Sequence, residues 1–482
     1  MKIITAVLII IINLTIAYGN DVDFDSFMSD SLLNGAFVGI AVKDLTTDSV
    51  IYDYNADKRF STASNLKLFT SAAALELLDP DYRFVTSFYA DGRVVSKGEL
   101  KGNLVIVGGG DPLISGRFRD SLTEVLVYWC DSLQAREINK IHGDIIVDNS
   151  FFEDDEIGAG WSYDYLSYWY ACPISALSFN DNCVDFKAYP SAQIGEACSL
   201  NFNPPTDYIT VTNNTITLPA GSENTFDYRR HPETNIVEFF DGIAVDDTSG
   251  LIDYVSVDKP DIYCATIFSD VLKQNDIEFK GKIKEINYND LSKENYYNRI
   301  IHLFDWYSEP LSVVIKVINK NSQNFFAEQT LKTIGSELTG EGSFAISTCL
   351  VQDWLESIGI SRDEVFYYDG SGLSHMNLAT PMSIIKLLDY MYHSENSAVY
   401  YESLAIPGVD RSVRKRMANN PLASQMRTKT GSIANTRTFS GYLTTKSGRL
   451  MAFSIMVNNY SPTEEAIDNW TDKLCGYIID SY

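Results

Sequence analysis

A strongly helical pattern occupies residues 61–78, which read STASNLKLFTSAAALELL. Their apolar side chains recur at the spacing of one helical face, at Leu66, Phe69, Ala73 and Leu77. Three successive alanines, which favour helix strongly, lie in the middle of the stretch. Asp79-Pro80 follows, and proline cannot continue a helix. The pattern predicts a buried helix that begins near Ser61 and ends before Asp79.

The start of this helix carries a hydroxyl and an amine. Ser64 and Lys67 are three residues apart, so both side chains lie on one helical face. A serine is a poor nucleophile unless a nearby base takes its proton, and a lysine is such a base if burial or a second cation lowers its pKa. Taken alone, Ser-x-x-Lys favours a solvated lysine on the surface of a helix.

A second hydroxyl and an amide occur in a polar break between two helical segments, in Ser322-Gln323-Asn324. Serine and asparagine are also favoured as helix caps, so a cap is the alternative interpretation of this segment.

A third polar segment, Lys429-Thr430-Gly431-Ser432, directly precedes a predicted strand. A cation and a hydroxyl beside a glycine suit a ligand that carries a carboxylate and lies along the edge of a sheet. An ordinary turn is the alternative.

In this order, the three segments resemble the signature of penicillin-binding proteins and class A β-lactamases: Ser-x-x-Lys, Ser-Asp-Asn and Lys-Thr-Gly. The departure is Gln323, which replaces aspartate in the second motif. The chain as a whole resembles the low-molecular-mass class C penicillin-binding proteins, the DacB-type D-alanyl-D-alanine carboxypeptidase/endopeptidase family. The further segments that carry the resemblance are residues 108–112 (GGGDP), 175–178 (SALS), 180–182 (NDN) and 369–374 (DGSGLS). Since β-lactamases are much shorter, the long gap between Lys67 and Ser322 favours the peptidase.

The resemblance implies an α/β fold, in which an antiparallel sheet covered by helices forms a penicillin-binding transpeptidase-like domain. Residues 20–87 and 299–482 are expected to form this domain, and residues 88–298 a β-rich insertion of two nested domains. Local patterns predict two hairpins and several helices. The expected strands are residues 36–42 with 49–52 and 438–443 with 450–457, and the expected helices are residues 311–318, 325–332, 381–393 and 462–479.

The resemblance also implies a reaction, which is acyl transfer from a peptide that ends in D-Ala-D-Ala or from a peptidoglycan cross-link. The roles that it suggests are a nucleophile (Ser64), a base (Lys67), a proton relay (Ser322), an amide that holds the base and the substrate (Asn324), and a carboxylate site (Lys429 with Thr430, beside Gly431). The charge of Lys429 is also expected to lower the pKa of Lys67. The backbone N–H groups of Ser64 and Ser432 are the expected oxyanion hole, and β-lactams are expected to be covalent inhibitors. A serine β-lactamase and a wall-binding module without catalysis are the alternatives.

One position departs from the family pattern. Many members have arginine directly after Gly-Ser-Gly-Leu-Ser, where it is expected to contact the acidic end of a diaminopimelate side chain, and this chain has His375. The family also has an acidic partner after a Trp-x-Trp segment. The corresponding residues here are Trp161-Ser162-Tyr163, so the acidic position aligns with either Asp164 or Tyr165. A neutral histidine lacks the fixed charge and forked donors of arginine, so a free diaminopimelate carboxylate should be bound less strongly. The alternative is that His375 is merely a loop residue.

Composition limits the other possibilities. The chain has 482 residues, 45% of them hydrophobic, and a formal charge of −26, which makes a nucleic acid an unlikely partner. Residues 1–19 have a short cationic start, an apolar centre and the end Ala17-Tyr18-Gly19, which predict a secretory signal peptide and a periplasmic or extracellular location. The seven cysteines and five histidines show no metal-ligand spacing, and no cofactor is expected. Export permits a disulfide among Cys172, Cys183 and Cys198, while buried free thiols are an equally good interpretation.

Overall fold

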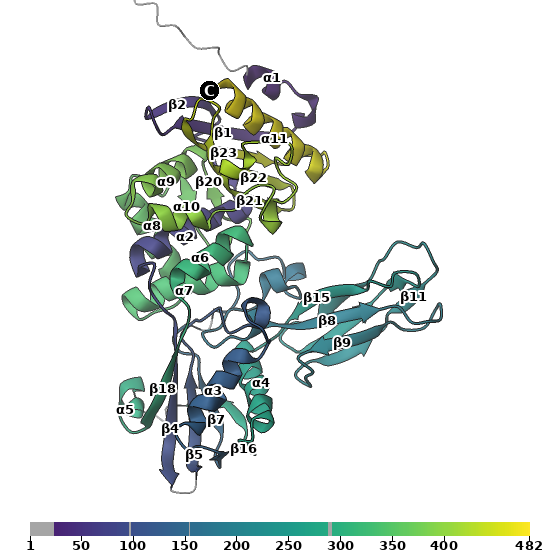
Figure 1. Cartoon of the computed structure of the whole chain (residues 1–482), viewed down its shortest axis with the longest axis vertical. Helices are drawn as coiled ribbons and strands as arrows, with labels where there is room; N and C mark the ends of the chain where they lie inside the picture. Colours follow the sequence, from purple (N-terminus) through teal and green to yellow (C-terminus); the bar gives the residue numbers. More distant parts are fainter. Residues whose placement is uncertain (1–23, 96–97, 154, 288–291) are drawn as a thin grey trace, which may run out of the picture.

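The computed structural model describes residues 24–95, 98–153, 155–287 and 292–482, so the predicted signal peptide of residues 1–19 lies outside the described part. The fold is mixed α/β, which confirms the predicted fold class. Figure 1 shows a helix-and-sheet part at the top, a second sheet with its own helices at the bottom, and a β-rich arm that projects sideways.

The upper part is built on an antiparallel sheet in the order β2-β1-β23-β22-β21. Its strands are β1 (Phe37–Asp44), β2 (Ser49–Tyr54), β21 (Arg427–Ile433), β22 (Thr436–Thr444) and β23 (Leu450–Asn458). Both predicted hairpins are present, and they join because β1 pairs with β23, with Ile40 opposite Ile455. The two ends of the described chain therefore meet in one sheet.

Helices cover both faces of this sheet, as predicted. Successive residues of a strand point to opposite faces, so Ile40 and Ile455 pack toward α11 (Glu464–Ser481) and α1 (Phe24–Met28). Ala41 and Met456 point the other way, into a helical layer. The helices of that layer are α2 (Lys67–Leu78), α6 (Leu311–Lys320), α7 (Asn324–Thr339), α8 (Phe344–Ser357), α9 (Pro381–His393) and α10 (Ser397–Ser403).

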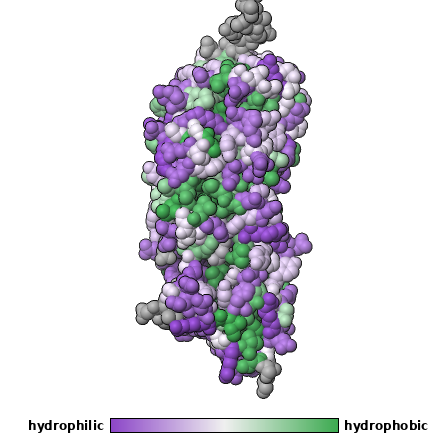
Figure 2. All heavy atoms as spheres, turned by 90° about the vertical axis from the view of Figure 1, so that its left-hand side faces the viewer, coloured by the Kyte–Doolittle hydropathy of each residue, from purple (hydrophilic) through white to green (hydrophobic). Residues whose placement is uncertain are grey.

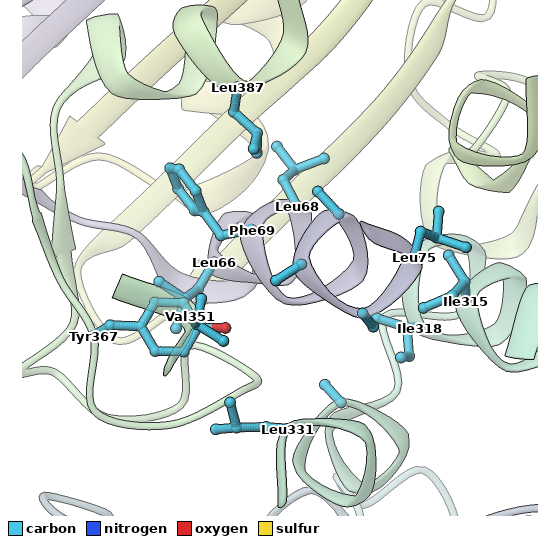
Figure 3. Packing of buried hydrophobic residues seen from close by; sticks show 14 of the residues in the cluster. Leu66, Leu68, Phe69, Leu75, Ile315, Ile318, Leu331, Val351, Tyr367 and Leu387 are labelled. Carbon is cyan, nitrogen blue, oxygen red and sulfur yellow. The ribbon is translucent and has the colours of Figure 1, made fainter. Parts of the chain in front are cut away.

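Helix α2 runs through the centre of this layer. Every residue from Lys67 to Leu75 is buried, because the helix is apolar around most of its circumference. Figure 3 shows its side chains meeting Leu387 of α9 on one side and Ile315, Ile318 and Leu331 of α6 and α7 on others. The helix ends at Leu78, as predicted, but begins at Lys67 and not near Ser61. Ala63 has a left-handed φ of +43°, which ends the extended segment and starts a separate 3-10 turn, Ala63–Leu66.

The lower part contains a second sheet in which β4 lies between β5 and β18. Its strands are β4 (Val85–Val95), β5 (Glu99–Val107), β6 (Lys140–Ile141), β7 (Ile145–Asp148), β16 (Glu278–Phe279), β17 (Ile283–Glu285) and β18 (Ile301–Tyr307). Helices α3 (Glu124–Gln134) and α4 (Pro260–Gln274) pack on one face, and α5 (Lys293–Tyr297) precedes β18. Because β18 pairs with β4, this sheet extends past residue 298, to Tyr307.

The arm holds the remaining strands of the inserted region. They are β8 (Cys183–Tyr189), β9 (Ser199–Asn203), β10 (Thr210–Asn213), β11 (Ile216–Leu218), β12 (Asp227–Arg230), β13 (Ile236–Phe240), β14 (Gly242–Ala244) and β15 (Leu251–Ser256). One buried cluster continues from Phe88 of the second sheet and Trp129 of α3 to Phe186 and Phe239 of the arm. The expected division into two nested domains stays a prediction.

A short sheet connects the start of α2 to a later loop. Its strands are β3 (Phe60–Ser61), β19 (Val365–Phe366) and β20 (Leu378–Ala379). Because β20 pairs with both β3 and β19, the loop of residues 367–377 lies beside the turn that precedes α2.

Hydrophilic side chains cover much of the face shown in Figure 2, which also carries hydrophobic patches at mid-height and near the lower end. Strand β18 carries two exposed hydrophobic side chains, Ile301 and Tyr307. Among the described residues, no helix combines the length and the apolar character needed to cross a bilayer. All seven cysteines are free thiols, and six of them are buried, so the alternative without a disulfide holds in this structure.

Candidate active site

Ser64 lies in the 3-10 turn directly before α2. The turn is strained, because the φ of +43° at Ala63 is unusual for a residue with a Cβ atom and costs about 1–3 kcal/mol. A loop packs tightly against it at Gly372, where a Cβ atom would come 1.9 Å from the carbonyl oxygen of Ala63. Gly372 also has a φ of +82°, so this close approach requires glycine.

Lys67 is fully buried and donates hydrogen bonds to three oxygens. Its Nζ lies 2.9 Å from Ser64 Oγ, 2.6 Å from Asn324 Oδ1 and 2.7 Å from the carbonyl oxygen of Ser371. Burial lowers the pKa of Lys67 to about 7, against the opposing effect of the negative charges of Glu328 and Asp369. A substantial fraction of Lys67 is therefore neutral near pH 7, with a lone pair available to the serine hydroxyl.

Two buried acids, which the sequence analysis did not single out, support this lysine. Glu328 of α7 accepts hydrogen bonds from the backbone N–H groups of Gly370, at 2.6 Å, and Ser371, at 2.8 Å. Burial, followed by the charge of Asp369, raises the pKa of Glu328 above its ordinary value. The spacing could have indicated this role, since Glu328 follows Asn324 by four residues and so lies on the same face of the helix.

Asp369 holds the other side of the same loop. It accepts hydrogen bonds from the N–H groups of Gly372 and Ser374, each at 2.7 Å, and from Trp161 Nε1 at 2.9 Å. Together, Asp369 and Glu328 fix the loop whose Ser371 carbonyl binds Lys67.

The second and third motifs meet each other across the site. Lys429 Nζ donates to Ser322 Oγ at 2.8 Å and to the carbonyl oxygen of Thr430 at 2.8 Å. Asn324, which accepts from Lys67, also donates from Nδ2 to the carbonyl oxygen of Tyr170 at 2.7 Å. The structure therefore brings together the five side chains predicted to be catalytic, through two sets of direct hydrogen bonds.

The cause of the low lysine pKa differs from the expectation. Burial lowers the pKa of Lys67, whereas the charge of Lys429 was expected to do so. The pKa of Lys429 is itself well below its ordinary value, mainly because of burial and then because of the charge of Lys67. A bound anionic group would favour the charged form of Lys429.

Strand β21 forms the edge of the site, and Gly431 is its point of closest approach to Ser64. A Cβ atom on Gly431 would lie 2.2 Å from Thr438 Oγ1, 2.8 Å from the carbonyl oxygen of Thr62 and 3.0 Å from the Ser64 nitrogen. Thr430 is half-buried, and Ser432 is exposed beside the guanidinium of Arg437, which donates to its hydroxyl.

His375 lies in the loop of residues 367–377. Its side chain is exposed and forms no hydrogen bond or ion pair with a described residue. Tyr165 packs on Tyr170, with ring centroids 5.5 Å apart, so it adjoins the segment that binds Asn324. Asp164 instead lines a cavity of about 880 Å³ at the base of the arm. The described residues contain no group of three or more His, Cys, Asp or Glu side chains placed to bind a metal ion.

The sequence profile of the D-Ala-D-Ala carboxypeptidase 3 (S13) family matches residues 21–474. The chain belongs to this family. The family predicted from the three motifs is therefore confirmed, and the serine carboxypeptidase activity expected from the sequence is the activity for which the S13 family is named.

Individual S13 relatives match most of the chain. A D-alanyl-D-alanine carboxypeptidase from Actinomadura sp. (strain R39) is 28% identical over 91% of this chain and 81% of its own length. The D-alanyl-D-alanine carboxypeptidase DacB of Haemophilus influenzae is 27% identical over 90% of this chain and 88% of its own. The crystal structure of penicillin binding protein 4 (dacB) from Haemophilus influenzae superposes with a TM-score of 0.81 at 24% identity, covering 93% of this chain and 98% of that one. This superposition confirms the fold.

Gly431→Ala tests the closeness of β21 to Ser64. The added methyl group would overlap backbone atoms of Thr62 and Ser64, so the strand has to move away, and we expect the rate of acylation by penicillin to fall at least about tenfold. The matched control is Gly476→Ala in α11, where the new Cβ has only an ordinary contact, 3.7 Å from Asn420 Nδ2. Equal acylation rates for both variants would show that β21 tolerates the shift and that its position is not critical.

Proposed function

We propose that this S13 family member is a serine D-alanyl-D-alanine carboxypeptidase/endopeptidase that hydrolyses peptidoglycan peptides through an acyl-enzyme. The observation that carries the proposal is the Lys67 Nζ lying 2.9 Å from Ser64 Oγ, in a buried setting that lowers its pKa to about 7. A general base works best when its pKa is close to the pH at which it operates.

In the first half of the reaction, neutral Lys67 accepts the proton of Ser64 as Oγ attacks the carbonyl carbon of the penultimate D-Ala. The oxyanion that forms is stabilised by the backbone N–H groups of Ser64 and Ser432, and one such donor is typically worth about 3–4 kcal/mol of barrier. Asn324 Oδ1 accepts a hydrogen bond from Lys67 Nζ, and this contact keeps the amine directed at the serine hydroxyl.

The intermediate then collapses and the C–N bond breaks. Ser322 relays to the departing amine the proton that Lys67 took from Ser64, so that D-Ala leaves as a neutral amine, Lys67 is neutral again and Ser64 remains as an ester. A water molecule attacks this ester, Lys67 accepts a proton from that water, and the peptide is released with a new carboxylate while Ser64 regains its proton. Lys429 lies 2.8 Å from Ser322 and supplies positive charge on the same side.

The terminal carboxylate of the substrate is bound by Lys429 with Thr430, on the strand edge next to Gly431. Burial disfavours the charged form of Lys429, and an arriving carboxylate restores it. Binding of an anionic substrate and protonation of Lys429 therefore favour each other.

Export and penicillin sensitivity belong to the same proposal. The predicted signal peptide would carry the chain to the periplasm or outside the cell, where peptidoglycan lies. A relative from Dictyostelium discoideum, 26% identical over 89% of this chain, is named penicillin-sensitive carboxypeptidase A. A crystal structure of the Haemophilus influenzae protein holds a bound β-lactam.

Fluorescent penicillin tests the proposal. We expect it to label Ser64 covalently, because a β-lactam offers an activated amide and a carboxylate to the same side chains as the peptide does, and we expect purified protein to release D-Ala from a pentapeptide. Ser64→Ala should abolish labelling and leave the thermal midpoint nearly unchanged, since the change removes one small hydroxyl. Label on another residue, found by mass mapping, would disprove the nucleophile. Rapid turnover of penicillin would favour a β-lactamase, and wall binding without D-Ala release a binding module.

The pH dependence tests the base. Only the neutral form of Lys67 accepts a proton, so the acylation rate should rise about tenfold per pH unit below its pKa and level off above about 7. Glu328→Gln removes a negative charge that raises the pKa of Lys67, so the midpoint should move to lower pH. Glu337→Gln, the same change at an exposed position of α7, is the control. A midpoint that is identical in all three proteins would contradict the assignment of the titration to Lys67.

His375→Arg tests side-chain selection at the third peptide residue. An arginine would supply a fixed charge and forked donors, so we expect kcat/KM for a pentapeptide with free diaminopimelate to rise about threefold to tenfold over its amide and over a lysine peptide. The matched control is His393→Arg, because His393 is also exposed but lies on α9 and not in the loop. Unchanged preference in His375→Arg would show that His375 is a loop residue without a part in selection.

A further inference from the structure

The central residue of the second motif makes its contact with the inserted region and not with the catalytic side chains. Gln323 Nε2 donates a hydrogen bond to Asp181 Oδ2 at 2.8 Å, across 142 residues of sequence. Gln323 is 8% exposed and Asp181 is 2% exposed, so this contact is shielded from water. A hydrogen bond from a neutral amide to a buried carboxylate is among the stronger kinds.

Asp181 is itself held firmly. Arg117 Nε donates to the same Oδ2 atom at 2.7 Å, and Arg117 Nη2 reaches Asp185 Oδ1 at 3.2 Å. The guanidinium stacks over the ring of Tyr254, 4.1 Å from its centroid. Asn180 donates from Nδ2 to Asp185 at 2.7 Å, which closes the network. The Asp181 carboxylate is therefore a fixed anchor in the insertion.

The backbone on both sides of this contact is unusual. Residues 180, 181 and 182 have φ values of 52°, 55° and 55°, and Ser322 has a φ of 58°. None of these four residues is glycine, so each is in a conformation that has to be maintained by its surroundings. Gln323 begins α7 as its N-cap residue but makes no capping hydrogen bond with its side chain. Its side chain instead donates a hydrogen bond to Asp181.

The consequence concerns the two neighbours of Gln323. Ser322 points to Lys429 and Asn324 points to Lys67, so a shift of the main chain at Gln323 would displace both contacts at once. Arg117, Asp181 and Gln323 also form part of the wall of a cavity of about 920 Å³. Beside this space, the hydrogen bond from Gln323 to Asp181 gives the start of α7 a fixed contact with the inserted region.

We propose that Asp181, held by Arg117, is a positioning residue for the reaction, and that it acts through Gln323 to hold Ser322 and Asn324 in register with the two lysines. The inserted region then contributes to catalysis without touching the substrate. This inference rests on the proposed function, because the register matters only if Ser322 and Asn324 take part in acyl transfer.

Gln323→Glu tests the contact, because two carboxylates would meet where an amide now donates to Asp181. We expect the rate of acylation by penicillin to fall at least about tenfold, while the final stoichiometry of label at Ser64 stays near that of the wild type. A merely structural role would lower the folded fraction, and with it the stoichiometry, and would leave the rate of the folded protein unchanged. If Gln323→Glu does not fold, Gln323→Met replaces it, since it keeps the length of the side chain and loses the hydrogen bond.

A double variant distinguishes the loss of the hydrogen bond from the effect of the introduced charge. In the double variant Gln323→Glu with Asp181→Asn, the introduced amide at 181 can donate to the introduced carboxylate at 323, so the acylation rate should return to within about threefold of the wild type. Asp472→Asn is the control, since Asp472 pairs with Arg416 and accepts from the Met417 N–H in a network on α11. That variant should acylate at the wild-type rate.

Three results would overturn the inference. A wild-type acylation rate in Gln323→Glu, or in Gln323→Met if that variant is used, would show that the contact does not position the motif. If the acylation rate of the double variant stays low, the loss of rate is due to the introduced charge and not to the broken contact. Absence of label at Ser64 in the wild type would remove the proposed function itself, whereas the first two results leave that function intact.

Discussion

The active site depends on the burial of one amine. Lys67 has no exposed surface, in a helical layer made of leucine, isoleucine and phenylalanine side chains. A buried charge is costly unless it is paired and hydrogen-bonded. Three oxygen acceptors and two buried acids reduce this cost, and the lowered pKa of about 7 reduces it further, because the lysine can be neutral. Burial makes the charged form of Lys67 energetically unfavourable, and for the same reason it allows the neutral amine to act as a base.

The acceptors come from separate segments, so this constraint organises the fold around α2. Asn324 is supplied by α7, and the carbonyl of Ser371 by a loop that closes against the Ser64 turn. Glu328 and Asp369 hold that loop by its N–H groups. Their negative charges also raise the pKa of Lys67 and so oppose the effect of burial. The pKa of the base is therefore a balance between desolvation and two nearby carboxylates.

The inserted region takes part in the same arrangement. The carbonyl of Tyr170 fixes Asn324, and Asp181 accepts from Gln323. Trp161 donates to Asp369 from the same inserted region. Three hydrogen bonds thus connect the insertion to the residues that surround Lys67. The insertion supports the catalytic part as well as forming a second sheet and an arm.

Elements with a local pattern could be predicted from the sequence. The strand runs of β1, β22 and β23, the helical spacing in α6, α9 and α11, and the end of α2 before Asp79-Pro80 all follow from residues close together in the chain. Helix α8 was not predicted, and the start of α2 was placed too early, because the left-handed Ala63 depends on the loop packed against it. The three motifs also identified the family, since their residue types and their order can be read from the sequence without any knowledge of contacts.

How those motifs work together could not be predicted in this way, because it depends on contacts between distant segments. Glu328, Asp369 and Asp181 are remote in sequence from Lys67, and residue type alone does not distinguish a buried acid from an exposed one. Burial of Lys67, which sets its pKa, is a property of the whole helical layer and cannot be assigned from Ser-x-x-Lys alone. Hydrogen bonds and desolvation act over a few ångströms in space, whatever the separation in sequence, so they are settled when the segments meet.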